Sequence, residues 1–184
     1  MNQTDLSSFN NSWYKPGNPV KRGLWYVCNI LFFTNRWFPF SSAKKGILKL
    51  FGAKIGKGVV IKPHVNIKYP WLLEIGDYTW IGERVWIDNL ARVKIGSNCC
   101  ISQGAMLLCG NHNYKKSTFD LITKPIVLED GAWVGAMCVV CPGVTIGSHA
   151  LLTVQSVATE TLEPYSLYKG NPAVKVRSRV ISQA

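Results

Sequence analysis

Residues 75–87 read IGDYTWIGERVWI and residues 95–107 read IGSNCCISQGAML, and both stretches follow one pattern of six residues. A branched aliphatic residue, here called the anchor, returns every six positions, and a small or β-branched residue comes four positions after nearly every anchor. This period fits neither the 3.6-residue repeat of an α-helix nor an ordinary hairpin sheet. It is typical of a parallel β-helix in which three hexapeptides form one triangular coil.

The pattern extends in both directions and governs about two-thirds of the chain. Its anchors are Ile55, Ile61, Ile67, Ile75, Ile81, Ile87, Ile95, Ile101, Leu107, Leu128, Val134, Val140, Ile146 and Leu152. Coils that start at 55, 75 and 95 are 20 residues apart, so each carries two extra residues at one corner. Glycine often follows the anchor directly, and we expect it to allow positive φ at the corners. The predicted fold is an all-β solenoid of about five coils.

One interval breaks the repeat and predicts an extruded loop. Leu107 and Leu128 are 21 residues apart instead of six, so about 15 residues leave the solenoid, within 108–127. A loop of this length is usually functional.

The open ends of a solenoid must be covered. We expect residues 1–52 to form a helical cap, with helices over 20–34 and 43–51 and Gly52 ending the second. The β-helix is expected over 53–163, and residues 164–184 are expected to form a tail, because Pro164 breaks the repeat.

The positive charge is concentrated near the N-terminus. The chain has 21 Lys and Arg against 10 Asp and Glu, and residues 1–70 hold 11 of the basic residues with Asp5 as their one acid. This basic, aromatic-rich segment suits an anionic membrane face or a polyanionic substrate, although a solvated face that favours solubility explains it as well. The longest apolar stretch, 23–33, is interrupted by Asn29 and is too short to span a bilayer. The expected location is cytoplasmic, with peripheral contact at the inner face of the membrane.

Cysteine and histidine point to one candidate catalytic residue and to no metal site. Six cysteines need no disulfides in a chain of this kind, and the pair Cys138 and Cys141 lacks the second pair that a zinc site requires. His64 and His149 fall at coil corners, where solvated histidines are ordinary. His112 lies in the extruded loop, where no core packing requires it, and can serve as a general base.

Five ordered motifs resemble a known family. They are GNHNY at 110–114, ITKPI at 122–126, DGAWVG at 130–135, PGVTIG at 142–147 and GNPA at 170–173. Together they resemble the hexapeptide-repeat acetyltransferases, in the branch of the maltose, galactoside and nodulation-factor O-acetyltransferases. SWYKPG at 12–17 and IKPHVNIKYP at 61–70 further resemble the exopolysaccharide, colanic-acid-type subgroup. The resemblance implies that the β-helix is left-handed.

The resemblance also implies an activity and its residues. The implied reaction moves an acetyl group from acetyl-CoA to a sugar hydroxyl of an exopolysaccharide or its precursor, with His112 as the base. Asn89 falls near a substrate-binding asparagine of the family, and Asp88 shares that corner, where it could orient acceptor hydroxyls; an Asx turn explains both residues as well. Trp133 matches a tryptophan beside the thioester, or simply shields a coil edge, and the N–H of Gly135 is a candidate oxyanion donor. The implied coenzyme-binding residues are Gly135, Ala136, Ser156, Thr159, Lys169, Lys175 and Arg177.

The same resemblance implies partners and leaves alternatives open. The family assembles as homotrimers with shared sites, and it implies a sugar acceptor, no nucleic acid and no metal. Glu160 stands where relatives often have a basic residue, which weakens a phosphate contact there. N-acetylation of an amino sugar or another small acceptor, and a non-catalytic scaffold, remain alternatives. A carbonic anhydrase on this fold is disfavoured, because the three histidines lack its ligand spacing.

Overall fold

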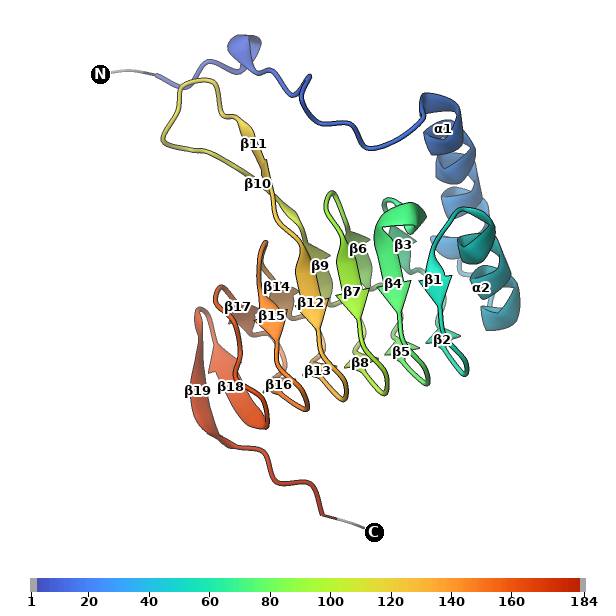
Figure 1. Cartoon of the computed structure of the whole chain (residues 1–184), viewed down its shortest axis with the longest axis vertical. Coiled ribbons are helices and arrows are strands. Elements are labelled where there is room, and N and C mark those ends of the chain that lie inside the picture. Colours follow the sequence, from blue (N-terminus) through green and yellow to red (C-terminus); the bar gives the residue numbers. More distant parts are fainter. Residues whose placement is uncertain (1–2, 183–184) are drawn as a thin grey trace.

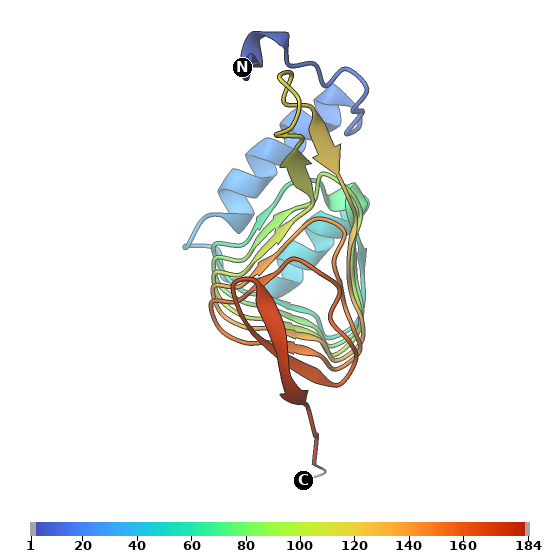
Figure 2. The same cartoon turned by 90° about the vertical axis from the view of Figure 1, so that its left-hand side faces the viewer.

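The computed structural model, which describes residues 3–182, confirms the parallel β-helix. The coils stack into a prism of triangular cross-section, with helices at one end and an antiparallel pair of strands at the other (Figures 1 and 2). Five coils are complete, and a sixth is partly formed.

Each coil adds one short strand to each of three parallel sheets. The first sheet contains β1 (Lys54–Ile55), β4 (Leu73–Ile75), β7 (Val93–Ile95), β12 (Ile126–Leu128) and β15 (Thr145–Ile146). The second contains β2 (Val60–Ile61), β5 (Trp80–Ile81), β8 (Cys100–Ile101), β13 (Trp133–Val134), β16 (Leu151–Leu152) and β18 (Ser166–Gly170), with β19 (Ala173–Ser178) antiparallel at its edge. The third contains β3 (Asn66–Ile67), β6 (Trp86–Asp88), β9 (Met106–Leu108), β14 (Val139–Val140) and β17 (Val157–Ala158).

The anchors form the core, as the repeat predicts. In the second sheet Ile81 pairs with Ile101, and Val134 pairs with Ile101 and Leu152, and all four side chains are buried. Burying one such aliphatic side chain contributes about 1.5–3 kcal/mol, and the stack repeats this contribution at every rung.

The expected role of the glycines after the anchors is wrong. Positive φ occurs three residues after the anchor instead, for example at His64 (59°), Arg84 (58°) and Met137 (57°). The glycines that directly follow an anchor are needed for close approach: a Cβ on Gly135 would lie 2.7 Å from both the Leu152 carbonyl oxygen and the Val154 nitrogen of the next coil. These glycines allow the corners to stack.

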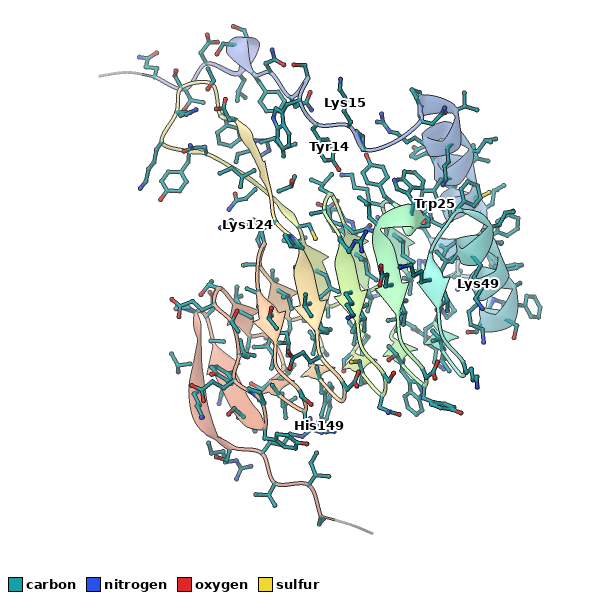
Figure 3. All side chains as sticks on the ribbon, viewed as in Figure 1. Tyr14, Lys15, Trp25, Lys49, Lys124 and His149 are labelled. Carbon is teal, nitrogen blue, oxygen red and sulfur yellow. The ribbon has the colours of Figure 1, made fainter. Side chains whose placement is uncertain are left out.

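The two expected helices form within two residues of their predicted bounds, whereas residues 3–18, expected in the cap, contain one short helical turn. Helix α1 (Pro19–Cys28) continues into a π-helical turn, η2 (Asn29–Phe33), and α2 (Ser41–Leu50) follows. Asn18 caps α1 by accepting from the N–H of Val20 at 2.8 Å, and Pro19 begins the helix. Trp25 and Phe33 are buried against the first coil, where the Trp25 Nε1 donates to the Ile67 carbonyl at 2.8 Å (Figure 3).

Two segments are more regular than the sequence indicates. The extruded loop contains an antiparallel hairpin, β10 (Gly110–His112) and β11 (Leu121–Thr123), which projects from the corner between the third and first sheets (Figure 1). The expected tail contributes β18, a further rung of the second sheet, before β19 folds back on it. The remaining helical turns are η1 (Leu6–Ser8) and η3 (Pro70–Leu72).

Candidate active site

His112 ends strand β10, and its ring is held in one orientation. The Nδ1 atom lies 2.8 Å from the Phe119 carbonyl oxygen, and the ring stacks on Phe119 with centroids 4.4 Å apart and an interplanar angle of 7°. Phe9 packs on it from the N-terminal segment with centroids 5.6 Å apart. Because a carbonyl oxygen only accepts, Nδ1 carries the proton in the neutral ring and Nε2 keeps its lone pair. This arrangement suits a general base that acts through Nε2.

A cavity of about 420 Å³ lies beside His112. Four parts of the chain border it: residues 3–18, which we call the N-terminal strap; helix α1; the corner between the third and first sheets; and the hairpin. Its lining residues are Phe9, Asn11, Tyr14, Pro16, Arg22, Lys68, Tyr69, Leu90, His112 and Leu121. Aromatic rings beside cations and a base are a suitable surface for a carbohydrate that carries hydroxyl groups.

The N-terminal strap is part of the site that the sequence reasoning missed. The Tyr14 hydroxyl donates to the Leu90 carbonyl at 2.7 Å, and the Trp71 Nε1 donates to the Pro16 carbonyl at 2.8 Å. Near the tip of the hairpin, the N–H of Asp5 donates to the Ser117 carbonyl at 2.9 Å. Burial raises the pKa of the Tyr14 hydroxyl well above its usual range, so this group remains a donor at neutral pH. Only the aromatic content of the strap hinted at this role.

Asn89 lies next to the cavity, but its side-chain amide is occupied by hydrogen bonds to the backbone of Tyr69. Its side chain is fully buried, with Oδ1 accepting from the Tyr69 N–H at 3.0 Å and Nδ2 donating to the Tyr69 carbonyl at 2.6 Å. In this position Asn89 holds Tyr69, which itself lines the cavity.

Asp88 forms an ion pair at the same corner. Its Oδ1 lies 3.0 Å from the Lys68 Nζ, and its backbone carbonyl accepts from the N–H groups of Leu90 and Cys109. The carboxylate thus offsets the charge of one of the two cations in the cavity lining, whereas Arg22 forms no ion pair within residues 3–182.

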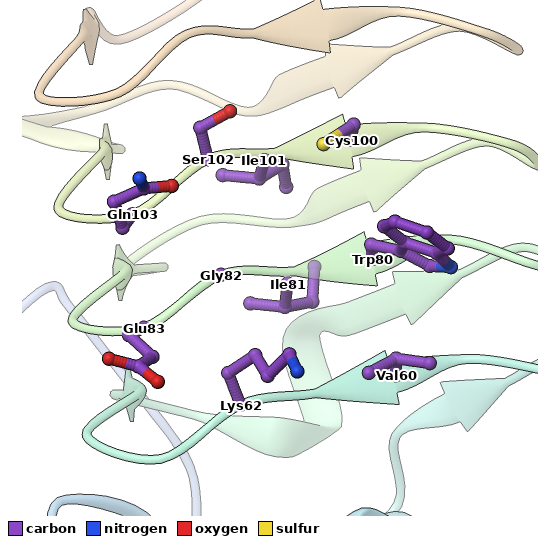
Figure 4. A pocket seen from close by; sticks show the side chains of 10 residues that line it. All are labelled: Val60, Lys62, Trp80, Ile81, Gly82, Glu83, Cys100, Ile101, Ser102 and Gln103. Atoms are coloured by element: carbon purple, nitrogen blue, oxygen red, sulfur yellow. The ribbon is translucent and has the colours of Figure 1, made fainter.

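A second hollow follows the outer face of the second sheet. One part has a volume of about 470 Å³ and is lined by Ser102, Gln103, Trp133, Gly135, Ala136, Leu151, Thr153 and Val154. A neighbouring part of about 590 Å³ shares Ser102 and Gln103 and continues past Trp80 and Glu83 to Lys62 (Figure 4). These two parts, called here the second-sheet groove, run along the stack of coils.

The backbone of the groove offers a donor, but at Ala136 and not at Gly135. The Gly135 N–H donates to the Leu152 carbonyl at 2.8 Å as part of the coil stacking, so the prediction that it faces the thioester is wrong for this geometry. Within residues 3–182 no protein acceptor receives the N–H of Ala136, which lines the groove. Trp133 stands beside it, and its Nε1 donates to the Ser102 hydroxyl at 2.9 Å.

The other predicted coenzyme residues are divided between the interior and the far end. Ser156 is buried, and its hydroxyl accepts from the Gly170 N–H at 2.9 Å, so it does not reach a ligand on the surface. Thr159 is exposed after β17, and Lys169 and Arg177 are exposed on β18 and β19. The Lys175 Nζ lies 2.6 Å from the Glu163 Oε2. The basic side chains therefore gather beyond Thr153, at the C-terminal end of the groove.

The six cysteines are free thiols, and three of them, Cys99, Cys109 and Cys138, are buried inside the coils. Burial raises the pKa of Cys99 and of Cys109 to about 11. In the part of the chain that the structure describes, no group of histidine, cysteine and acidic residues is arranged to hold a metal ion.

The structure separates the two halves of the site within one chain. His112 and its cavity lie at the corner between the third and first sheets, whereas Trp133 and Ala136 lie on the second sheet near its corner with the third. A single prism therefore does not bring the candidate base to the groove.

Comparison with known proteins shows relatives that match nearly the whole chain. No family model matches it. The chain is 38% identical over 183 residues to the "putative colanic acid biosynthesis acetyltransferase WcaF" of Escherichia coli K12, covering 96% of this chain and 97% of that protein. It is 25% identical over 137 residues to the galactoside O-acetyltransferase of the same organism, covering 73% of this chain and 68% of that protein.

Solved structures share the fold. A hexapeptide-repeat acetyltransferase of Vibrio cholerae complexed with acetyl coenzyme A superposes with a TM-score of 0.79 at 23% identity, covering 88% of each chain. A maltose O-acetyltransferase of Clostridium difficile superposes with a TM-score of 0.80 at 18% identity, also covering 88% of each chain. These neighbours are left-handed β-helices, in agreement with the expected fold class. The sequence of this chain and its coiled fold together establish that it belongs to the hexapeptide-repeat acetyltransferase family.

Proposed function

We propose that this enzyme transfers an acetyl group from acetyl-CoA to a sugar hydroxyl of an exopolysaccharide or its precursor. The observation that carries the proposal is the position of the His112 ring. Its Nδ1 is hydrogen-bonded to the Phe119 carbonyl at 2.8 Å, and the ring borders a cavity lined by aromatic and basic side chains that suit a sugar. The relative with 38% identity is named for colanic acid biosynthesis, which supports a polysaccharide acceptor.

In the proposed mechanism, Nε2 of His112 takes the proton from the acceptor hydroxyl as its oxygen attacks the thioester carbonyl carbon. The carbonyl oxygen then carries negative charge, and the free N–H of Ala136 is our candidate donor to it. When the tetrahedral intermediate collapses, the carbon–sulfur bond breaks and the sulfur leaves with the electron pair. The proton held by His112 passes to that sulfur, giving the acetyl ester and free CoA.

We place acetyl-CoA in the second-sheet groove. Two fold neighbours were solved with acetyl coenzyme A and with coenzyme A, which supports a ligand of this kind for the fold. Lys169 and Arg177 are exposed at the C-terminal end of the groove and are suitable contacts for the coenzyme phosphates. Trp133 covers the part of the groove beside Ala136.

The site would be completed by a homotrimer. One chain holds its base and its groove at different corners, so a neighbouring chain has to supply the second half. A triangular prism with one groove and one projecting hairpin per chain suits threefold closure, since every interface then contains one of each. Light scattering should give three times the 20.5 kDa of the chain.

The lining of the cavity beside His112 limits the chemical class of the acceptor. Its aromatic lining favours a sugar ring, whether the attacking group is a hydroxyl or, in the alternative, the amine of an amino sugar. We further propose that the enzyme works at the inner face of a membrane, where a lipid-carried precursor would be found. No helix within residues 3–182 is long and apolar enough to cross a bilayer.

The test is the release of CoA thiol with a panel of sugar acceptors. His112→Ala should lower kcat by about 10²–10⁴ while the KM for acetyl-CoA stays the same. His149→Ala is the matched control, because this histidine stacks on Tyr165 at a coil corner and should be replaceable. If His112→Ala keeps the wild-type rate with an accepted sugar, His112 is not the base.

A further inference from the structure

Helix α1 presents apolar side chains on two sides, and only one side is covered. Trp25 faces the first coil and is buried. On the outer side, Val20, Leu24, Val27 and Leu31 follow one another at intervals of four, three and four residues and are 70%, 59%, 52% and 51% exposed. This spacing places them in one stripe along α1 and η2. A helix that is apolar on both sides normally lies in a core or against a membrane, and nothing in the described chain covers this stripe.

The surroundings of the stripe carry positive charge. The cations are Arg36, in the segment between η2 and α2, and Lys45 and Lys49 on α2. None of them forms an ion pair within residues 3–182. No acidic residue occurs between Asp5 and Glu74. Figure 3 shows Lys49 on α2 at the capped end of the solenoid, away from β18 and β19.

Exposed aromatic residues complete this surface. Trp37 is 83% exposed in the connection between η2 and α2, and Phe40 is also exposed. Tryptophan and tyrosine favour the interface between lipid headgroups and acyl chains, where their apolar rings and polar atoms are both accommodated.

We propose that α1, η2 and α2 form a docking surface for an anionic lipid bilayer, with Val20, Leu24, Val27 and Leu31 inserted and Lys45 and Lys49 among the headgroups. Charge complementarity favours this occupant: an acid-free, cation-flanked apolar stripe matches anionic lipid, whereas a second copy of the same surface would place like charges together. Neither the apolar stripe nor the charge alone holds a protein on a membrane, but the two together give reversible attachment.

This inference rests on the proposed peripheral location, and it does not depend on the acetyl transfer. In a threefold trimer with parallel prism axes, all three caps face the same direction, so three weak contacts act at once. Arg22 of helix α1 lines the cavity beside His112, so a sugar acceptor in this cavity would lie close to a bilayer docked on α1.

The experiment is flotation of the full chain with vesicles of phosphatidylcholine alone or with phosphatidylglycerol added. We expect binding only with the anionic lipid and a steep loss of binding with added salt. Leu24→Gln combined with Leu31→Gln should weaken binding at least tenfold, and Lys45→Gln and Lys49→Gln should each weaken it about fivefold. The matched control is Val174→Gln with Val176→Gln, two exposed valines on β19 at the other end of the prism, which should bind as wild type does.

Thiol release with a soluble acceptor and light scattering are measured on the same variants. We expect both to be unchanged, because these side chains lie outside the cavity and the groove. The proposal is overturned if the wild-type protein stays with the unbound fraction on anionic vesicles, or if the leucine variant binds as tightly as the control. It is also overturned if the leucine variant changes the oligomeric state, because the stripe would then be an interface between copies of the chain. Loss of thiol release in the wild-type protein with every acceptor would instead count against the proposed function.

Discussion

Two inactive variants should restore activity when they assemble together, because the base and the groove lie at different corners of one prism. The first variant is His112→Ala, which removes the base and leaves the groove. The second is Ala136→Trp, whose large side chain would fill the groove beside Trp133, while the buried anchor Val134 is untouched. Each variant alone should form trimers and release almost no thiol.

The expected recovery follows from the geometry of a ring of three chains. A site works only if its hairpin comes from an Ala136→Trp chain and its groove from the neighbouring His112→Ala chain. Going round any trimer that contains both variants, this order occurs once, so about one site in three is intact. In an equal mixture with random assembly, about one quarter of the wild-type activity should return.

The assay uses co-expressed chains with two different tags, so that mixed trimers are isolated before thiol release is measured. The control pairs His112→Ala with the double variant His112→Ala and Ala136→Trp, which can form no intact site. If isolated mixed trimers show no more activity than this control, both halves of the site come from the same chain and the shared-site reasoning is wrong.

Three further predictions concern stability and are measured by urea or thermal unfolding. Burial lowers the pKa of Lys44 from 10.5 to about 8, so the folded chain loses this proton at lower pH than the unfolded chain does. The free energy of unfolding should therefore rise with pH between these values, by about 2–3 kcal/mol from pH 7 to pH 10 relative to Lys44→Met. The same pH dependence in the wild type and Lys44→Met would contradict this. Gly135→Ala should lower the free energy of unfolding by about 1–3 kcal/mol, because the added Cβ would meet backbone atoms at 2.7 Å. Gly46→Ala, in open space on α2, should raise it by about 0.5–1 kcal/mol, and equal effects of the two substitutions would refute the close-approach explanation. Asn89→Ala should cost about 2–5 kcal/mol, because it leaves the buried N–H and carbonyl of Tyr69 without partners; an unchanged unfolding midpoint would show that Asn89 does not hold Tyr69.

The repeat predicted the solenoid because the aliphatic side chain at each anchor position indicates that this position is buried. Ile81 and Ile101 are both anchors of the six-residue repeat, and they pair because one coil of three repeats and two extra residues spans the 20 residues between them. The end of the cap was also predictable, since Gly52 was expected to terminate the second helix and takes a φ of 97° just after α2. His112 was recognisable because it lies in an insertion, where no packing explains it.

Details that depend on contacts between coils were not predictable from a single coil. Gly135 was expected to present its N–H to a ligand, but this N–H donates to the Leu152 carbonyl of the next coil. The N–H of the neighbouring Ala136 has no protein acceptor within residues 3–182. Ser156 is different, because it lies four residues after the anchor Leu152, so the repeat itself indicated an inward side chain and only the family resemblance suggested a ligand contact. The N-terminal strap reaches His112 through Phe9, across about one hundred residues of sequence, with no periodic signal to indicate it.

The order of the coils gives the proposed reaction a direction along the prism. The cavity beside His112 extends from the hairpin, which leaves the solenoid after β9, toward Arg22 on α1 and Lys68 at the first corner. The second-sheet groove spans the stack from Lys62 in the first coil to β16, beyond which Lys169 and Arg177 are exposed. Because both features are fixed to the same rigid stack, the acceptor would enter from the capped end and the coenzyme phosphates would lie at the C-terminal end. A bilayer docked on α1 would thus face the acceptor cavity and leave the coenzyme end open to solution. The two substrates of an acetyl transfer to a lipid-carried sugar come from these two environments.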